Sequence, residues 1–166
     1  MGQNIIHVSP TYVDKVFEEK GFFETEVSTL QLLEANFINN PVIDHYPFPK
    51  LISSDVKNYT IRITSCGLNL KQDHSAYSDT ICREYLKCTI DCIVNNLKNL
   101  FIVHHNIHER NFCINSKGHV HLIDFETALR KSESYITRKP ARAKYCLERI
   151  ENYRDEFKEL IYNYIT

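Results

Sequence analysis

The first part of the chain has a pattern typical of short β-strands. Runs rich in β-branched and aromatic residues alternate with turn-forming residues. These runs cover residues 4–8 and 12–17, and then residues 51–53 and 59–64. Within each pair the two runs are separated by only a few polar or turn-forming residues, so the pattern predicts two β-hairpins.

Hydrophobic residues recur at helical spacing in three other segments. The spacing predicts helices over residues 24–36, 80–103 and 143–164. Three prolines between residues 41 and 49 predict a loop after the first helix. Two short apolar runs, at residues 112–114 and 120–123, flank a turn rich in polar residues and predict a third hairpin.

The order of these elements predicts an α+β fold. A small β-rich part with one helix, residues 1–66, comes before a mostly helical part, residues 67–166, that contains one short hairpin. A chain of 166 residues is long enough to bury a core and short enough to form one domain. We therefore expect a single domain over residues 1–166.

The composition is that of an ordinary globular protein, with 43% hydrophobic and 25% charged residues. The net charge of −1 provides no general attraction to nucleic acid or to an anionic membrane, so both are disfavoured as partners. No signal peptide and no apolar stretch long enough to cross a bilayer is evident. The six cysteines form no CxxC pair. These features predict a cytoplasmic protein with reduced thiols.

The most informative stretch lies at residues 104–126, around the third predicted hairpin. In an antiparallel hairpin, the entry to the first strand and the exit from the second lie side by side. Asn111 and Asp124 occupy these two positions. An amide oxygen and a carboxylate that converge there are suitable ligands for Mg²⁺, which takes its remaining ligands from water and phosphate. The sequence therefore predicts a magnesium site at the open end of the hairpin.

This stretch resembles the catalytic loop and metal loop of the protein-kinase superfamily, HxDxxxxN followed by a hairpin and DFG. His104 matches the histidine, Asn111 the metal-binding asparagine, and Asp124-Phe125 the first two positions of DFG. Glu126 replaces the glycine. The resemblance implies a minimal protein-kinase-like fold in which Asp124 and Asn111 hold Mg²⁺ on the phosphates of ATP.

The resemblance fails at the catalytic base. Asn106 occupies the position of the catalytic aspartate, and an amide cannot accept the proton of a substrate hydroxyl. A lost base is the simpler interpretation, whereas His108 or Glu109 is a candidate substitute. The phosphoryl transfer reaction depends mainly on positioning and charge neutralisation, so weak activity without the aspartate remains open.

The N-terminal part provides separate support. Lys15 lies in an apolar run that resembles the kinase strand whose lysine holds the α- and β-phosphates, and Glu26 resembles the partner glutamate of the αC helix. A lysine in an apolar strand needs an anion nearby. Glu24 is the rival to Glu26, and a lysine that extends to solvent from an edge strand is the alternative for Lys15.

Other kinase features are weak or missing. The stretch around Cys66 and Gly67 resembles the linker between the kinase lobes, where backbone groups meet the adenine. The four glycines form neither a Gly-rich loop nor a GxxxxGK[ST] motif. We therefore expect a reduced N-lobe, a truncated C-lobe, and weak binding of any ATP and Mg²⁺.

Two other features suggest different chemistry. Four histidines, at positions 104, 108, 119 and 121, allow a zinc site to be imagined, although their spacing fits no known zinc motif. The basic segment from Arg130 to Lys144 could recognise an acidic protein, phosphate or RNA, but such a run is most often a solvated loop.

Three classes of function remain open from the sequence. The favoured one is a pseudokinase that acts through a protein partner. The second is an atypical ATP-dependent phosphotransferase that uses Lys15, Asn111 and Asp124 without the usual base. The third is a zinc-binding or purely structural module.

Overall fold

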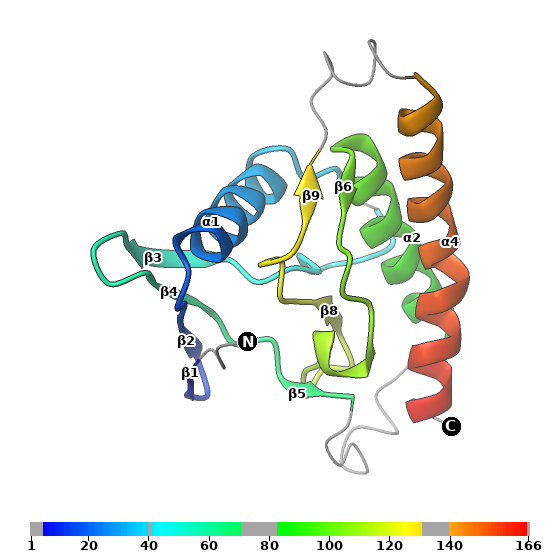
Figure 1. Cartoon of the computed structure of the whole chain (residues 1–166). Coiled ribbons are helices and arrows are strands. Elements are labelled where there is room, and N and C mark those ends of the chain that lie inside the picture. Colours follow the sequence, from blue (N-terminus) through cyan, green and yellow to red (C-terminus); the bar gives the residue numbers. More distant parts are fainter. Residues whose placement is uncertain (1–4, 40, 71–82, 131–139, 166) are drawn as a thin grey trace.

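Figure 1 shows a computed structural model of the chain, which describes residues 5–39, 41–70, 83–130 and 140–165. The N-terminal part contains a four-stranded antiparallel sheet in the order β1-β2-β4-β3. Its strands are β1 (Ile5–Val8), β2 (Tyr12–Val16), β3 (Leu51–Asp55) and β4 (Thr60–Thr64). Both hairpins predicted from the sequence are therefore present, and β2 and β4 form the centre of the sheet.

One helix, α1 (Lys20–Ala35), packs against this sheet through contacts with β3 and β4. It begins at Lys20, one turn earlier than the hydrophobic spacing indicated. Its buried face contains Phe23, Leu30 and Leu33, which join residues of the sheet in the core. The segment from residue 36 to residue 50 leaves α1 and returns to the sheet at β3. On its way it contacts β8, where the backbone N–H of Leu122 donates to the carbonyl oxygen of Pro47 at 3.1 Å.

The C-terminal part combines two long helices with short strands. Helix α2 (Arg83–Asn99) packs against α4 (Pro140–Ile165). A three-stranded sheet has the order β5-β7-β8, with β5 (Leu68–Asn69), β7 (Phe112–Ile114) and β8 (Val120–Leu122). Strands β6 (Ile102–Val103) and β9 (Leu129–Arg130) form a separate two-stranded sheet, and a 3₁₀ turn, η2 (Glu109–Asn111), precedes β7.

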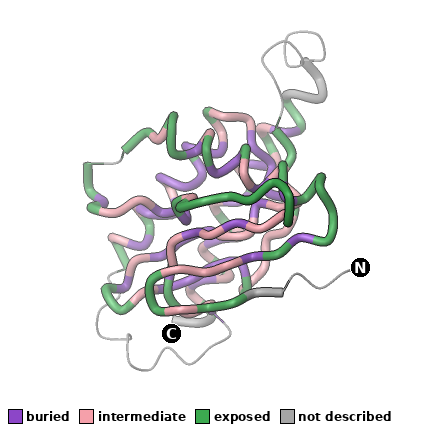
Figure 2. Tube along the Cα trace, turned by 90° about the vertical axis from the view of Figure 1, so that its left-hand side faces the viewer, coloured by how far each residue is buried: buried purple, intermediate pink, exposed green. Residues whose placement is uncertain are grey.

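A continuous hydrophobic cluster connects the two parts. It contains Phe17, Leu30 and Ile61 from the N-terminal part and Ile93 and Phe157 from α2 and α4. Figure 2 shows that the buried segments lie in the interior, whereas the exposed ones lie on the loops and outer edges. The cluster fixes the sheet and the β7–β8 hairpin relative to each other, because neither can shift without opening packed apolar surface.

The prediction for the second helix was wrong at its C-terminal end. The chain does not stay helical to residue 103: α2 ends at Asn99, Phe101 adopts a positive φ of 51°, and Ile102–Val103 form strand β6. Apolar residues in a buried two-residue strand continue the helical pattern by coincidence, so periodicity alone could not separate the two elements. The predicted start of this helix lies outside the described residues.

None of the helices in the described part of the chain is long and apolar enough to span a membrane.

Candidate functional site

The side chain of Lys15 is the centre of a buried charge cluster. It projects from β2 and is only 5% exposed. Its Nζ lies 3.0 Å from Oε2 of Glu26 on α1 and 2.6 Å from Oδ1 of Asp124, which follows β8. The cluster therefore joins the N-terminal sheet, its helix and the hairpin of the C-terminal part.

The two carboxylates keep Lys15 charged. Burial alone would lower the pKa of Lys15, but Glu26 and Asp124 outweigh it and raise that pKa above its ordinary value. Burial has the opposite effect on Glu26 and raises its pKa to about 7, although Lys15 pulls that value down. The second oxygen of Glu26, Oε1, is buried without a hydrogen-bond partner. The ionised form of Glu26 is thus disfavoured by burial and depends on the ion pair with Lys15.

The structure distinguishes between the two glutamates on α1. Glu26 is fully buried, whereas Glu24 is exposed and pairs with Lys20 one turn earlier. The structure also rules out the alternative that Lys15 extends to solvent, because its ammonium group lies inside the molecule. The ion pair that the sequence suggested between Lys15 and Glu26 is present, while a role of either residue in cofactor binding stays a prediction.

Asn111 and Asp124 lie at the open end of the β7–β8 hairpin. The backbone N–H of Ile123 donates to the carbonyl oxygen of Asn111 at 2.9 Å, so the ladder extends one step beyond the strands. The amide nitrogen of Asn111 donates to the carbonyl oxygen of Asn106 at 2.9 Å. This bond uses the nitrogen and leaves the amide oxygen as the end that can meet a cation.

The backbone of Asp124 has an uncommon conformation. Its φ is 69°, in the left-handed region that non-glycine residues seldom adopt and that often occurs at functional sites. The ion pair with Lys15 holds the side chain in place there. Asp124 keeps a side-chain exposure of 21%, so its carboxylate is accessible to a ligand as well as bound to Lys15.

His104 stabilises this end of the hairpin through hydrogen bonds to the backbone. It is fully buried, and one of its ring nitrogens, Nε2, lies 2.9 Å from the carbonyl oxygen of Ile123. Its other ring nitrogen accepts from the backbone N–H of Asn106 at 3.4 Å. Burial lowers the pKa of His104 to about 4 and keeps the ring neutral. His104 therefore holds the backbone of Asn106 and that of Ile123, the residue before Asp124.

A cavity of about 650 Å³ lies between the N-terminal sheet and the hairpin. Of the residues predicted for the site, five line it: Lys15, Cys66, His108, Asn111 and Asp124. Glu26 lies behind Lys15. Asn106 and Glu109 are not among the described residues that line the cavity. His108 does line it, and its Nδ1 accepts from the backbone N–H of Arg110 at 3.1 Å. A role of His108 or Glu109 as substitute base stays a prediction.

Two features of this cavity were not predicted from the sequence: the presence of Arg110 in its lining and the close backbone approach at Gly67. Arg110 lines it and adds a cation next to Asn111; its position inside the catalytic-loop motif was the available signal. Gly67 has a φ of 98°, and a Cβ there would lie 2.2 Å from the carbonyl oxygen of Ile114. Only glycine allows the linker to pass so close to the hairpin. That close approach could not be read from the sequence.

The zinc arrangement imagined from four histidines is not found. His104, His108, His119 and His121 all lie in the described part of the chain, and they do not converge as one ligand group there. His104 supports the hairpin and His108 faces the cavity, whereas His119 lies at the other end of the hairpin. Most of the basic segment, residues 131–139, lies outside the described residues.

Comparisons with known proteins support one conclusion about the fold. No protein-family model and no curated protein matches the chain. The structure is similar to that of the Cydia pomonella granulovirus kinase PK-1, with a TM-score of 0.51 and 17% sequence identity. The match covers 72% of this chain and 43% of the viral kinase, so the chain spans less than half the length of that protein.

The likeness to the viral kinase is one of fold, and it agrees with the arrangement described above. An antiparallel sheet with a buried lysine, one helix with a buried glutamate, and a hairpin that ends in asparagine and aspartate all occur in the order that the sequence predicted. The predicted fold class and the predicted resemblance are therefore confirmed: the chain has a partial protein-kinase-like fold of the α+β class.

Proposed function

We propose that this chain is a pseudokinase that binds ATP and Mg²⁺ in the cavity and acts through a protein partner. The observation that carries the proposal is the position of Lys15, which is held between Glu26 and Asp124 and at the same time lines the cavity. A buried cation kept charged beside an open cavity is suited to bind an anion, and a phosphate group is an anion of this kind.

The lining of the cavity combines apolar and charged residues. Val13, Ile63 and Cys66 form an apolar side that suits a planar base. Burial raises the pKa of the Cys66 thiol, so this residue behaves there as a small apolar group. Lys15 and Arg110 add positive charge to the lining, and Asp124 and Glu126 add negative charge. The volume of about 650 Å³ lies within the usual range for cofactor pockets, roughly 300–1,000 Å³.

Asn111 and Asp124 fit the preferences of Mg²⁺. One provides an amide oxygen and the other a carboxylate, and both line the cavity beside Lys15. When bound, the ion would neutralise phosphate charge. Asn106 orients the amide of Asn111 through its carbonyl oxygen, and Lys15 orients the carboxylate of Asp124. These two contacts therefore position both metal-binding side chains within the protein itself.

Two features support a pseudokinase over an active kinase. Asn106 cannot act as a base, a function that is typically worth about 10²–10⁴-fold in rate. The turn between β1 and β2, Ser9-Pro10-Thr11, contains no glycine to cover a phosphate. A module that binds nucleotide without transferring phosphate acts by contact, so a protein is the expected partner.

One observation favours the alternative, an atypical phosphotransferase. His108 lines the cavity, and its Nδ1 accepts from the backbone N–H of Arg110, so the neutral ring carries its proton on Nε2. To act as a base, the ring would have to break this hydrogen bond and use the lone pair on Nδ1. A histidine in this position could replace the missing aspartate. The two functions share a binding site and differ only in whether phosphate leaves the nucleotide.

Nucleotide binding is tested by thermal unfolding of the chain with ATP and Mg²⁺. At ten times the Kd, we expect the Tm to rise by about 3–6 °C. The rise should require both components and disappear in Asp124→Ala and Asp124→Asn. Asp155→Ala, which removes an exposed carboxylate on α4, is the matched control and should keep the full response. No response in the wild-type protein, or an equal response in all variants, would overturn the proposal.

Phosphate transfer from radiolabelled ATP then separates the two functions. A pseudokinase should transfer nothing to itself or to mixed protein substrates, whereas Asn106→Asp gains measurable transfer. Transfer by the wild-type protein that is lost in His108→Ala would replace the pseudokinase with the atypical phosphotransferase.

A further inference from the structure

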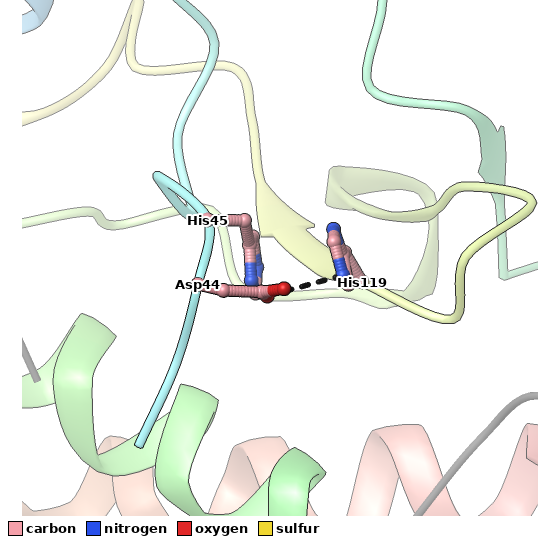
Figure 3. A group of neighbouring side chains, drawn as sticks. All are labelled: Asp44, His45 and His119. Carbon is pink, nitrogen blue, oxygen red and sulfur yellow. Dashed lines mark ion pairs between the residues drawn. The ribbon is translucent and has the colours of Figure 1, made fainter. Parts of the chain in front are cut away.

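A second polar cluster lies at the closed end of the β7–β8 hairpin. Asp44 and His45 belong to the segment between α1 and β3, and His119 directly precedes β8. Figure 3 shows the three side chains pointing toward one another from these two segments. One potential ligand atom from each lies within 4.8 Å of the other two, and within the described part of the chain no other group of three His, Cys, Asp or Glu does so.

We propose that Asp44, His45 and His119 form a Zn²⁺ site that fastens the α1–β3 segment to the hairpin. Two imidazoles and one carboxylate are a donor set that suits Zn²⁺, with a fourth position left for water. Oxygen-preferring cations such as Mg²⁺ are a poor match for imidazole nitrogens. The site differs from the cavity in both ligand type and position.

The spacing of the donors supports this assignment. The Nε2 of His119 lies 3.4 Å from Oδ1 of Asp44. This is too long for a good hydrogen bond to a carboxylate. Ligands of a tetrahedral zinc ion, each about 2.0–2.1 Å from the metal, lie roughly 3.3–3.4 Å from one another. The separation of the two atoms is therefore close to that of two zinc ligands, and the His119 ring has only to turn, not to travel, to reach the ion.

The hydrogen bonds of His45 select the nitrogen that would bind. Its Nε2 lies 3.1 Å from the carbonyl oxygen of Val120, and a carbonyl can only accept, so Nε2 carries the proton. The lone pair is therefore on Nδ1. A ligating histidine usually donates its other N–H to a carbonyl or carboxylate, which is the arrangement seen here.

One hydroxyl group is shared between two acceptors of the cluster. The hydroxyl of Tyr85 lies 2.8 Å from Nδ1 of His45 and also donates to Oδ1 of Asp44. One hydroxyl proton cannot serve both acceptors at the same time. When Tyr85 donates to Asp44, the lone pair on Nδ1 of His45 receives no proton from Tyr85 and is available to a divalent cation.

Binding would require one movement. The rings of His45 and His119 are stacked, with centroids 4.2 Å apart and planes at 11°. A metal lies in the plane of each ring that binds it, so two parallel rings cannot share one ion until one of them turns. His119 can turn more easily, because His45 is held by Val120 and Tyr85. Metal binding should therefore break the stack.

The experiment is a Zn²⁺ titration of the untagged, reduced protein without nucleotide, followed by thermal unfolding and calorimetry. We expect one ion per chain and a Tm increase of about 5–10 °C at 100 times the Kd. Asp44→Ala and His119→Ala, which alter two different segments, should each weaken Zn²⁺ binding by more than about 100-fold. His7→Ala, which removes an exposed histidine on β1, should bind as the wild type does.

Two further measurements test the geometry. NMR of the histidine rings should show Nδ1 of His45 bound to the metal and Nε2 still protonated, together with loss of the ring-current shifts of the stacked pair. Asp124→Ala should keep its Zn²⁺ response even if it loses the response to ATP and Mg²⁺. The zinc proposal and the nucleotide proposal can therefore be contradicted separately. Absence of binding, or unchanged binding in both Asp44→Ala and His119→Ala, would overturn the proposal.

Discussion

The two ends of the β7–β8 hairpin carry polar groups in very different settings. At the open end, Lys15 and Glu26 form a buried ion pair, and Lys15 also pairs with Asp124, which has a rare backbone conformation. At the closed end, the side chain of Asp44 is 79% exposed and the neighbouring histidines are stacked on each other. A short hairpin of three-residue strands therefore has buried ion pairs at one end and a largely exposed polar cluster at the other.

This difference predicts where substitution of a polar side chain destabilises the fold most. Buried charges depend on their partners, because an unpaired charge in the interior cannot be compensated by water. Exposed polar groups lose little when a partner is removed, because water replaces it. The open end should therefore contribute to stability in the protein as it stands, and the closed end should do so mainly when a ligand is present.

The largest effect is expected for Lys15→Met. It leaves Glu26 buried without its counter-ion, and breaking a buried ion pair typically costs about 3–5 kcal/mol of the free energy of unfolding. The pKa of Glu26 is already raised to about 7 by burial, and loss of Lys15 raises it further. Unfolded Glu26 ionises near pH 4.5, so the variant loses stability as the pH rises above that value. Urea unfolding at pH 6 and pH 8 should show a larger loss at pH 8.

Two variants test the cause of this loss. Lys20→Met removes an exposed lysine that pairs with Glu24, and it should change stability by less than about 1 kcal/mol. Lys15→Met combined with Glu26→Gln should recover part of the loss, because the orphaned charge is gone. If Lys15→Met were no more damaging than Lys20→Met, the open end would not be a coupled cluster.

A smaller effect is expected from pH through His104. Burial lowers its pKa in the folded protein to about 4, whereas the unfolded histidine titrates near 6.5. Below pH 6.5 the unfolded state binds a proton that the folded state does not, so the free energy of unfolding falls as the pH drops toward 4. The slope from this one residue is about 1.4 kcal/mol per pH unit in that window.

NMR titration of the histidine rings identifies the residue responsible. The ring of His104 should stay neutral until the protein unfolds. Urea unfolding at several pH values gives the slope. A ring of His104 that titrates above pH 6 in the folded protein would contradict its buried supporting role.

The residues at the open end could be identified from the sequence because they belong to a recognisable motif. Asn111 and Asp124 bracket two short strands, and their convergence follows from the geometry of a hairpin. The lysine and the glutamate required only an apolar strand and a helix with an acidic residue on its inner face. Lys15 and Asp124 are 109 positions apart, so their contact could be expected only through the resemblance to kinases.

The closed end could not be predicted in the same way. His45 lies in a proline-rich loop that has no periodic pattern, and its contact with Val120 spans 75 positions. Only the path of the α1–β3 segment along β8 brings them together. The same limit explains the error at the end of α2, because β6 exists only through its pairing with β9, and neither two-residue strand has a pattern of its own.

The smallest effect is expected for His119→Ala in the absence of metal. The substitution removes the stacking with His45 and the contact with Asp44, and a ring pair of this kind contributes about 0.5–1.5 kcal/mol beyond its burial. The loss should therefore stay near 1 kcal/mol, well below that of Lys15→Met, because water reaches the exposed side of the cluster. Urea unfolding in a chelator measures it, with His7→Ala as the control. If His119→Ala were as destabilising as Lys15→Met, the closed end would already be part of the rigid core, and no ligand would be needed to explain why these side chains meet.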